Sequence, residues 1–234
     1  SSPLSDERIG VDSLTYPGIK SAAKLFGVQL VPIEQENGHM SERGIKNAVK
    51  NDGVRALFVM PDYQNPTAYI MSTEDREMIA SCAKEHELLI IEDGICKLLA
   101  GSRSSIHDLA PDNTIFTLSL SKTVSPALRT AYIAAPPHCR AALDEAIYAV
   151  NLSQSALLSE LAARLIASKE LDRLLSRRVE GIEKRNELVD IILADFELRG
   201  DSHSLSRWLV LPDGITSAQF EREAARRGVC VYGA

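Results

Sequence analysis

Short, mainly apolar segments recur through the first half of this chain, and each is followed by a stretch long enough for a helix. The clearest are residues 55–60 (RALFVM), 88–91 (LLII) and 114–120 (TIFTLSL). A strand that is apolar on both faces must be covered on both faces, which is typical of a parallel sheet between layers of helices. The pattern therefore predicts an α/β fold with a mostly parallel sheet.

Local signals predict the remaining elements of this region. Apolar and β-branched residues indicate three further strands, at residues 8–13, 28–33 and 130–135. A helix that follows Tyr16-Pro17-Gly18 and runs through Phe26 is predicted from the helical spacing of Ala22, Ala23 and Phe26, and Gly27 is a natural helix stop. Two more helices are predicted to start after the N-cap residues Ser41 and Ser72.

The chain changes character after residue 137. Residues 137–199 carry leucines at helical spacing and predict at least one long helix. The end of the chain predicts a strand at 205–211, a helix at 216–227 and a last strand at 229–232. The resulting division is a large domain over residues 1–150, linking helices over 151–199, and the start of a small α+β C-terminal domain over 200–234.

Charge and composition narrow the functional classes. The 234 residues carry a net charge of −6, and the few basic pairs are surrounded by acids, which argues against nucleic-acid contact by this chain itself. No apolar run is long enough for a membrane span, and no signal peptide opens the chain. The four cysteines are far apart and form no CxxC pair, which favours a reducing cytoplasm and argues against a metal site.

Polar residues gather where three successive predicted strands end. The three loops are residues 61–67 (PDYQNPT), 92–96 (EDGIC) and 119–122 (SLSK), the last followed by Arg129. The carboxyl ends of parallel strands meet at one edge of a sheet, where α/β proteins bind ligands. We therefore expect an amide, a carboxylate, hydroxyls, an amine and a guanidinium to converge there.

Pyridoxal phosphate requires this set of groups. Its aldehyde needs a lysine amine, which Lys122 can supply, and nearby positive charge with partial burial would keep that amine neutral. A carboxylate such as Asp93 would keep the ring nitrogen protonated, so that the ring can act as an electron sink. The Asn65 amide can donate to the phenolic oxygen of the ring.

The remaining requirements are an aromatic face and a phosphate site. Tyr16, at the end of the first strand, is placed to stack on the pyridine ring. Ser119, Ser121 and Arg129 can supply hydroxyls and a bidentate cation to the phosphate.

Each of these residues also has an ordinary structural explanation. Asn65-Pro66 is a common turn dipeptide, residues 92–94 could form a solvated turn, and Tyr16 could simply pack. Lys122 could be a solvated lysine, and Arg129 could form a surface ion pair worth little. Their joint occurrence, each at a strand end, favours a binding site.

These segments also resemble a known family. The stretches TYPG, DYQNPT, IIEDGIC, SLSKTVSPALR and RWLVLP resemble the class I/II (fold type I) aminotransferases that use pyridoxal phosphate. The resemblance covers nearly the whole chain and implies a homodimer with Lys122 as the Schiff-base lysine and Asp93 at the ring nitrogen. It also implies the roles above for the remaining cofactor residues, which are Tyr16, Asn65, Ser119, Ser121 and Arg129.

Two branches of the family are similar to this chain. One contains the aminoadipate and kynurenine aminotransferases. The other contains regulators of the MocR/GntR type, in which an aminotransferase-like domain follows a winged-helix DNA-binding domain. The segment IHDLAPDNTIFTLSLSK resembles the regulators more than the free enzymes.

The chain departs from the family pattern in three ways. Cys96 stands where the family usually has a tyrosine, which puts the tuning of the ring oxygen in doubt. Ala68, Ala127 and Thr130 replace usual glycines. The chain also resembles only part of the family, from the second half of the large domain to a point before the strand that carries the substrate-carboxylate arginine, so it looks truncated at both ends.

Three functions stay open at this stage. The first is amino transfer between an amino acid and a 2-oxo acid, with Lys122 as the base and Asp93 sustaining the electron sink. The second is a pyridoxal-phosphate-binding effector domain of a MocR/GntR-type transcriptional regulator, whose DNA-binding domain would lie outside this chain. The third is an α/β protein without a cofactor, which leaves the convergence of the three loops unexplained.

Overall fold

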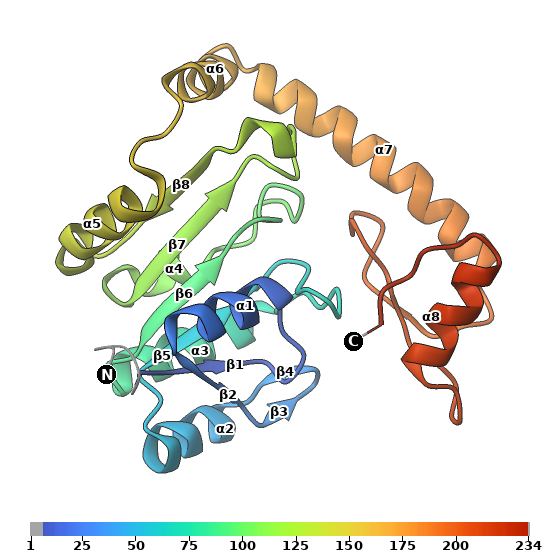
Figure 1. Cartoon of the computed structure of the whole chain (residues 1–234), viewed down its shortest axis with the longest axis horizontal. Coiled ribbons are helices and arrows are strands. Elements are labelled where there is room, and N and C mark those ends of the chain that lie inside the picture. Colours follow the sequence, from blue (N-terminus) through green and yellow to red (C-terminus); the bar gives the residue numbers. More distant parts are fainter. Residues whose placement is uncertain (1–6, 234) are drawn as a thin grey trace.

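The computed structural model describes residues 7–233 and has a six-stranded sheet at its centre (Figure 1). The strand order is β2-β1-β5-β6-β7-β8; β7 and β8 are antiparallel, and all other neighbours are parallel. The strands are β1 (Arg8–Val11), β2 (Gln29–Pro32), β5 (Ala56–Val59), β6 (Leu89–Asp93), β7 (Thr114–Ser119) and β8 (Ala131–Ala134). The predicted α/β fold with a mostly parallel sheet is confirmed.

Helices occupy both faces of this sheet and then continue away from it (Figure 1). They are α1 (Pro17–Phe26), α2 (Glu42–Asn47), α3 (Thr73–Glu85), α4 (Ile106–Leu109), α5 (Arg140–Asn151), α6 (Ala156–Ala167), α7 (Glu170–Ile192) and α8 (Ser217–Arg226). The predicted N-caps are present: the Ser41 side chain accepts from Gly44 N–H, and Ser72 forms a reciprocal capping box with Asp75. Gly27 ends α1 with φ of 74°, in the left-handed region that glycine adopts without strain.

Alternation along the strands divides the core into two layers. Leu57 and Ile90 pack in the larger cluster, which includes residues of α2, α3 and α4. Phe58 and Ile91, one position along, pack in the second cluster with Ile19 of α1. Successive side chains of a strand point to opposite faces, so the sheet is covered by α1 on one face and by α2, α3 and α4 on the other.

The region after β8 differs in detail from the sequence prediction. The long helical stretch is three helices, because Leu152 and Lys169 adopt positive φ between them. The strand predicted at 205–211 shortens to β10 (Trp208–Leu209), which pairs antiparallel with β9 (Leu198–Arg199). The strand predicted at 229–232 is wrong, since a strand needs a paired neighbour and these apolar residues line a cavity instead.

One hairpin was not predicted. Strands β3 (Gln35–Glu36) and β4 (His39–Met40) are joined by Asn37 and Gly38, both with positive φ. Asn-Gly is the dipeptide most typical of such a two-residue turn, so the signal was present in the sequence.

Candidate active site

The three polar loops do converge, because β5, β6 and β7 are consecutive neighbours in the sheet. A cavity of about 940 Å³ lies at this edge, and its lining includes Tyr16, Asn65, Asp93 and Lys122. The opposite wall comes from the end of the chain and is mostly apolar, with Trp208 and Phe220 among its residues. Four of the seven residues predicted from the sequence therefore share one cavity.

Asp93 is the last residue of β6 and lies on the α1 side of the sheet, in the same alternation as Ile91. Its Oδ1 accepts a hydrogen bond of 3.1 Å from Ile95 N–H. Burial raises the pKa of Asp93, and the Ile95 hydrogen bond offsets part of that rise. A cationic partner in the cavity would stabilise the ionised form of this carboxylate.

Gly94 keeps the Asp93 turn close to the neighbouring strand. Its N–H donates to Thr117 O at 2.8 Å. A Cβ at position 94 would lie 2.6 Å from the Phe116 ring and 2.8 Å from Thr117 O, so a larger residue would displace the turn. The sequence IIEDG thus fixes where the Asp93 carboxylate stands.

Glu92 has the opposite orientation and a structural role. It is fully buried, and its two carboxylate oxygens accept from Ile106 N–H at 3.1 Å and His107 N–H at 2.8 Å, at the start of α4. The solvated turn considered for residues 92–94 is therefore wrong at Glu92. Burial raises the pKa of Glu92 to about 7, although the two N–H donors oppose the rise.

This raised pKa predicts a pH dependence of stability. Between the unfolded value near 4.5 and the folded value near 7, the native state binds more protons than the unfolded chain. The free energy of unfolding should therefore fall as pH rises through this window, by about 1–3 kcal/mol from Glu92. The free energy of unfolding, measured by urea denaturation at several pH values from 5 to 8, should fall less steeply with pH for Glu92→Gln than for the unchanged chain. An equal dependence on pH in the two proteins would contradict the assignment of the effect to Glu92.

Lys122 follows β7 in a turn closed by Val124 N–H donating to Leu120 O at 2.8 Å. Its side chain is exposed, so the expected partial burial of this lysine is not observed. Burial raises the pKa of Cys96 to about 12, and the positive charge of Lys122 offsets part of that rise. The Cys96 side chain near Lys122 is therefore a neutral thiol, which forms only weak hydrogen bonds.

Tyr16 is the N-cap residue of α1, and Pro17 occupies the first helical position. The side chain is 40% exposed and lines the cavity. A Cβ at Gly18 would lie 2.1 Å from the Tyr16 ring, so only glycine at position 18 lets the ring rest over the first turn of α1.

The three residues predicted for a phosphate lie together at the end of the β7–β8 pair. Ser119 Oγ donates to Ser121 Oγ at 2.8 Å and accepts from Ser121 N–H at 3.1 Å. The antiparallel register pairs Ser119 with Ala131, and Leu120 N–H donates to Thr130 O, so Arg129 is the residue directly before this paired end of β8. These three residues are not part of the lining shared by Tyr16, Asn65, Asp93 and Lys122.

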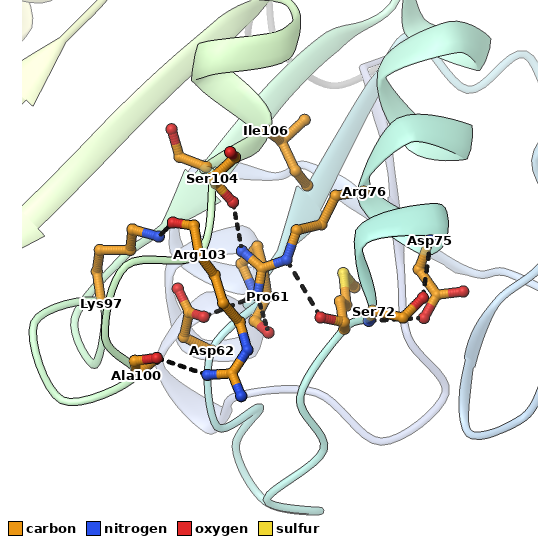
Figure 2. A network of polar contacts seen from close by, with 12 residues as sticks. Pro61, Asp62, Ser72, Asp75, Arg76, Lys97, Ala100, Arg103, Ser104 and Ile106 are labelled. Atoms are coloured by element: carbon orange, nitrogen blue, oxygen red, sulfur yellow. Dashed lines mark hydrogen bonds and ion pairs between the residues drawn. The ribbon is translucent and has the colours of Figure 1, made fainter.

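A buried arginine holds two of the loops at this edge (Figure 2). Arg76, on α3, is 1% exposed and pairs with the Asp62 carboxylate at 2.7 Å. It also donates to Pro61 O at 3.0 Å, Met71 O at 3.2 Å and Ser104 O at 3.0 Å. The loop that carries Asn65 is thus anchored to α3 and to the loop before α4.

Some cavity residues were missed by sequence reasoning. Tyr63 is buried beside Asn65, and Trp208, the single tryptophan of the chain, faces the cavity from β10. Burial raises the pKa of Tyr63, and the nearby Asp201 carboxylate adds to the rise. Tyr63 lay within the DYQNPT segment, but nothing in its spacing indicated that it would contact residues more than 100 positions away.

Comparison with known proteins decides the family. The sequence profile described as aminotransferase class I and II matches residues 4–230. The chain belongs to this family. The aminotransferase relationship agrees with the α/β fold and with the resemblance predicted from the loop sequences.

Particular relatives of this aminotransferase-family chain fall into two groups. The uncharacterized HTH-type transcriptional regulator YdeF of Bacillus subtilis is 41% identical over 229 residues, which are 97% of this chain and 50% of the regulator. Aromatic-amino-acid aminotransferase 1 of Thermococcus litoralis is 23% identical over 235 residues, which are 94% of this chain and 56% of that protein. Regulators and enzymes thus both match along nearly all of this chain.

A solved structure shows the same fold. LysN, an α-aminoadipate aminotransferase from Thermus thermophilus crystallised with N-(5'-phosphopyridoxyl)-L-leucine, superimposes with a TM-score of 0.83 at 22% identity. The match covers 96% of this chain and 60% of LysN. The chain therefore spans about half to three-fifths of the length of these relatives.

The described residues contain neither a candidate membrane span nor a candidate metal cluster. Across residues 7–233, no helix is both long and apolar enough to cross a membrane. In the same part of the chain, no group of three or more histidine, cysteine, aspartate or glutamate residues is placed to hold a metal ion.

Proposed function

We propose that this chain forms the cofactor-binding part of a pyridoxal-phosphate-dependent aminotransferase that moves an amino group between an amino acid and a 2-oxo acid. The observation that carries the proposal is the shared cavity of Lys122, Asp93, Asn65 and Tyr16 at the carboxyl edge of the sheet. When bound, pyridoxal phosphate supplies an aldehyde and an electron-withdrawing ring.

The residues present fit this cofactor by their chemistry. Asp93 is a partly buried carboxylate with one described hydrogen bond, so it can accept another from a protonated ring nitrogen. Lys122 supplies the amine that holds the aldehyde and moves a proton at the substrate Cα. Asn65 can donate to the ring oxygen, and Tyr16 offers an aromatic face.

The phosphate would lie at the end of the β7–β8 pair. Ser119 and Ser121 offer hydroxyls there, and Arg129, whose side chain is exposed, offers a guanidinium that matches phosphate geometry. We also propose that the protein is a homodimer, as the family resemblance implies, and that it is cytoplasmic, in keeping with four free cysteines.

A second candidate is the effector domain of a transcriptional regulator. The 41% identity to an HTH-type regulator along 97% of this chain favours it. A neutral thiol at Cys96 also gives weaker hydrogen bonding near Lys122 than a phenol would, which suits a binding domain better than an efficient enzyme. In this alternative the same cavity binds the cofactor or its amino-acid adduct as a signal.

The test is absorption spectroscopy with added pyridoxal phosphate, on this chain and on any longer protein that contains it. We expect a visible band that borohydride makes permanent, and we expect some member of a panel of amino acids to convert the bound cofactor to its amine form. Release of the matching 2-oxo acid would identify the substrate. A band with no conversion by any amino acid would favour the effector domain, and no band in either protein would refute cofactor binding.

A further inference from the structure

Gln64 is a buried side-chain amide next to Asn65, and the roles proposed above give it none. It is 4% exposed, although glutamine is usually a surface residue. Its Nε2 donates to Leu14 O at 2.5 Å. Its Oε1 accepts from Thr67 N–H at 3.0 Å and from Thr67 Oγ1 at 2.5 Å. Both the nitrogen and the oxygen of the Gln64 amide are therefore hydrogen-bonded.

These hydrogen bonds join two different loops of the cavity. Leu14 lies two residues before Tyr16, in the connection from β1 to α1. Thr67 lies two residues after Asn65, and the Gln64 backbone closes the same loop, with its N–H donating to Tyr69 O and its O accepting from Ala68 N–H. Within residues 7–233, no other hydrogen bond connects residues 12–16 with residues 61–69.

The Tyr16 ring and the Asn65 side chain are only partly held by packing. The Tyr16 ring is 40% exposed, so surrounding side chains hold it only in part. Asn65 is also exposed, and its placement follows from the turn around it. A buried amide that is hydrogen-bonded at both its nitrogen and its oxygen resists displacement, because moving either partner leaves a polar group unsatisfied.

We infer that Gln64 is a positioning residue that sets the Tyr16 ring relative to the Asn65 amide across the cofactor cavity. This inference rests on the proposed function, because it assumes that the cavity binds pyridoxal phosphate. Gln64 acts through the Leu14 carbonyl on one side and through Thr67 on the other, without contact with the cofactor itself.

The sharpest variant is Gln64→Glu, which preserves size and the acceptor for Thr67. The ionised carboxylate presents an oxygen to Leu14 O in place of the donor, so the link to the Tyr16 loop is lost; binding is therefore measured at alkaline pH, where the carboxyl is ionised. We expect the dissociation constant for pyridoxal phosphate, followed by quenching of Trp208 fluorescence, to rise about tenfold. Gln64→Met, which removes both donor and acceptor, should weaken binding at least as much.

Asn113→Ala is the control. The Asn113 side-chain amide donates to Ala83 O at 3.4 Å and to Leu88 O at 3.2 Å, and Asn113 is not in the lining of the cavity. Its loss should lower the stability of the chain without changing cofactor affinity. A tenfold loss of affinity in this control as well would show that general destabilisation, rather than the Gln64 link, weakens binding.

Two further readouts separate positioning from general packing. In a Tyr16→Ala background, Gln64→Glu should change the dissociation constant by less than about twofold, because its effect is transmitted through Tyr16. In the protein without cofactor, Gln64→Glu should speed amide hydrogen exchange in residues 12–19, and Asn113→Ala should not.

The outcomes distinguish this inference from the proposed function. If the unchanged protein binds cofactor and Gln64→Glu binds it equally well, the positioning role is refuted while the function stands. If the unchanged protein binds no cofactor, the proposed function fails, and unaltered hydrogen exchange in residues 12–19 of Gln64→Glu would refute the structural link too.

Discussion

Lys122→Ala should abolish covalent retention of pyridoxal phosphate. After borohydride treatment and denaturation, the unchanged protein should keep the label on one lysine, and the variant should keep none. The physical reason is that Lys122 is the lysine in the lining of the cavity that also holds Asp93 and Asn65. Since the Lys122 side chain is exposed, its truncation should change the free energy of unfolding by no more than is usual for surface substitutions, about ±0.5 kcal/mol.

Lys20→Ala is the matched control for this experiment. Lys20 is an exposed lysine of α1, close in sequence to Tyr16 but absent from the cavity lining. Its variant should be labelled as fully as the unchanged protein. Mass spectrometry of peptides locates the label, and a label that persists in Lys122→Ala would assign the chemistry to another lysine.

Arg76→Met should cost about 3–5 kcal/mol of unfolding free energy, the range expected when one partner of a buried ion pair is removed. The Asp62 carboxylate would stay buried without its partner, and three backbone carbonyls, Pro61 O, Met71 O and Ser104 O, would lose a charged donor (Figure 2). Asp62 Oδ2 already has no hydrogen-bond partner, so the carboxylate depends on Arg76 through its other oxygen. Urea denaturation measures the loss.

Two comparisons test the cause of this loss. Arg43→Met removes an exposed ion pair with Glu34 and should cost at most about 1 kcal/mol. Adding Asp62→Asn to Arg76→Met removes the stranded charge and should recover part of the stability, about 0.5–3 kcal/mol. A cost of Arg76→Met similar to that of Arg43→Met would contradict the buried network.

Much of the sheet was predictable because its signals are local. The runs RALFVM and LLII became β5 and β6, since residues that are apolar on both faces of a strand leave few alternatives to a covered parallel sheet. The caps at Ser41 and Ser72 formed as predicted, because a capping hydrogen bond spans only three residues. The convergence of the three loops followed from their place at strand ends.

The parts that failed depend on partners distant in sequence. Residues 229–232 have strand-like composition, but no neighbouring strand pairs with them in the described structure, and they line the cavity. Glu92 and Asp93 are adjacent carboxylates with different roles. Glu92 accepts hydrogen bonds from the start of α4, and Asp93 lines the cavity. Alternation along a strand separates the two, but only the packing of α4 and α1 decides which face holds the site.

The sequence alone determined the six strands of the central sheet, the N-caps at Ser41 and Ser72, and the chemical set of amine, carboxylate, amide and hydroxyls at successive strand ends. Only the tertiary structure decided that Gln64 ties the Tyr16 loop to the Asn65 loop, and that Arg76 anchors Asp62. The physical reason is separation along the chain. Gln64 and Leu14 are 50 residues apart, and no local pattern marks which buried polar group will satisfy which distant carbonyl.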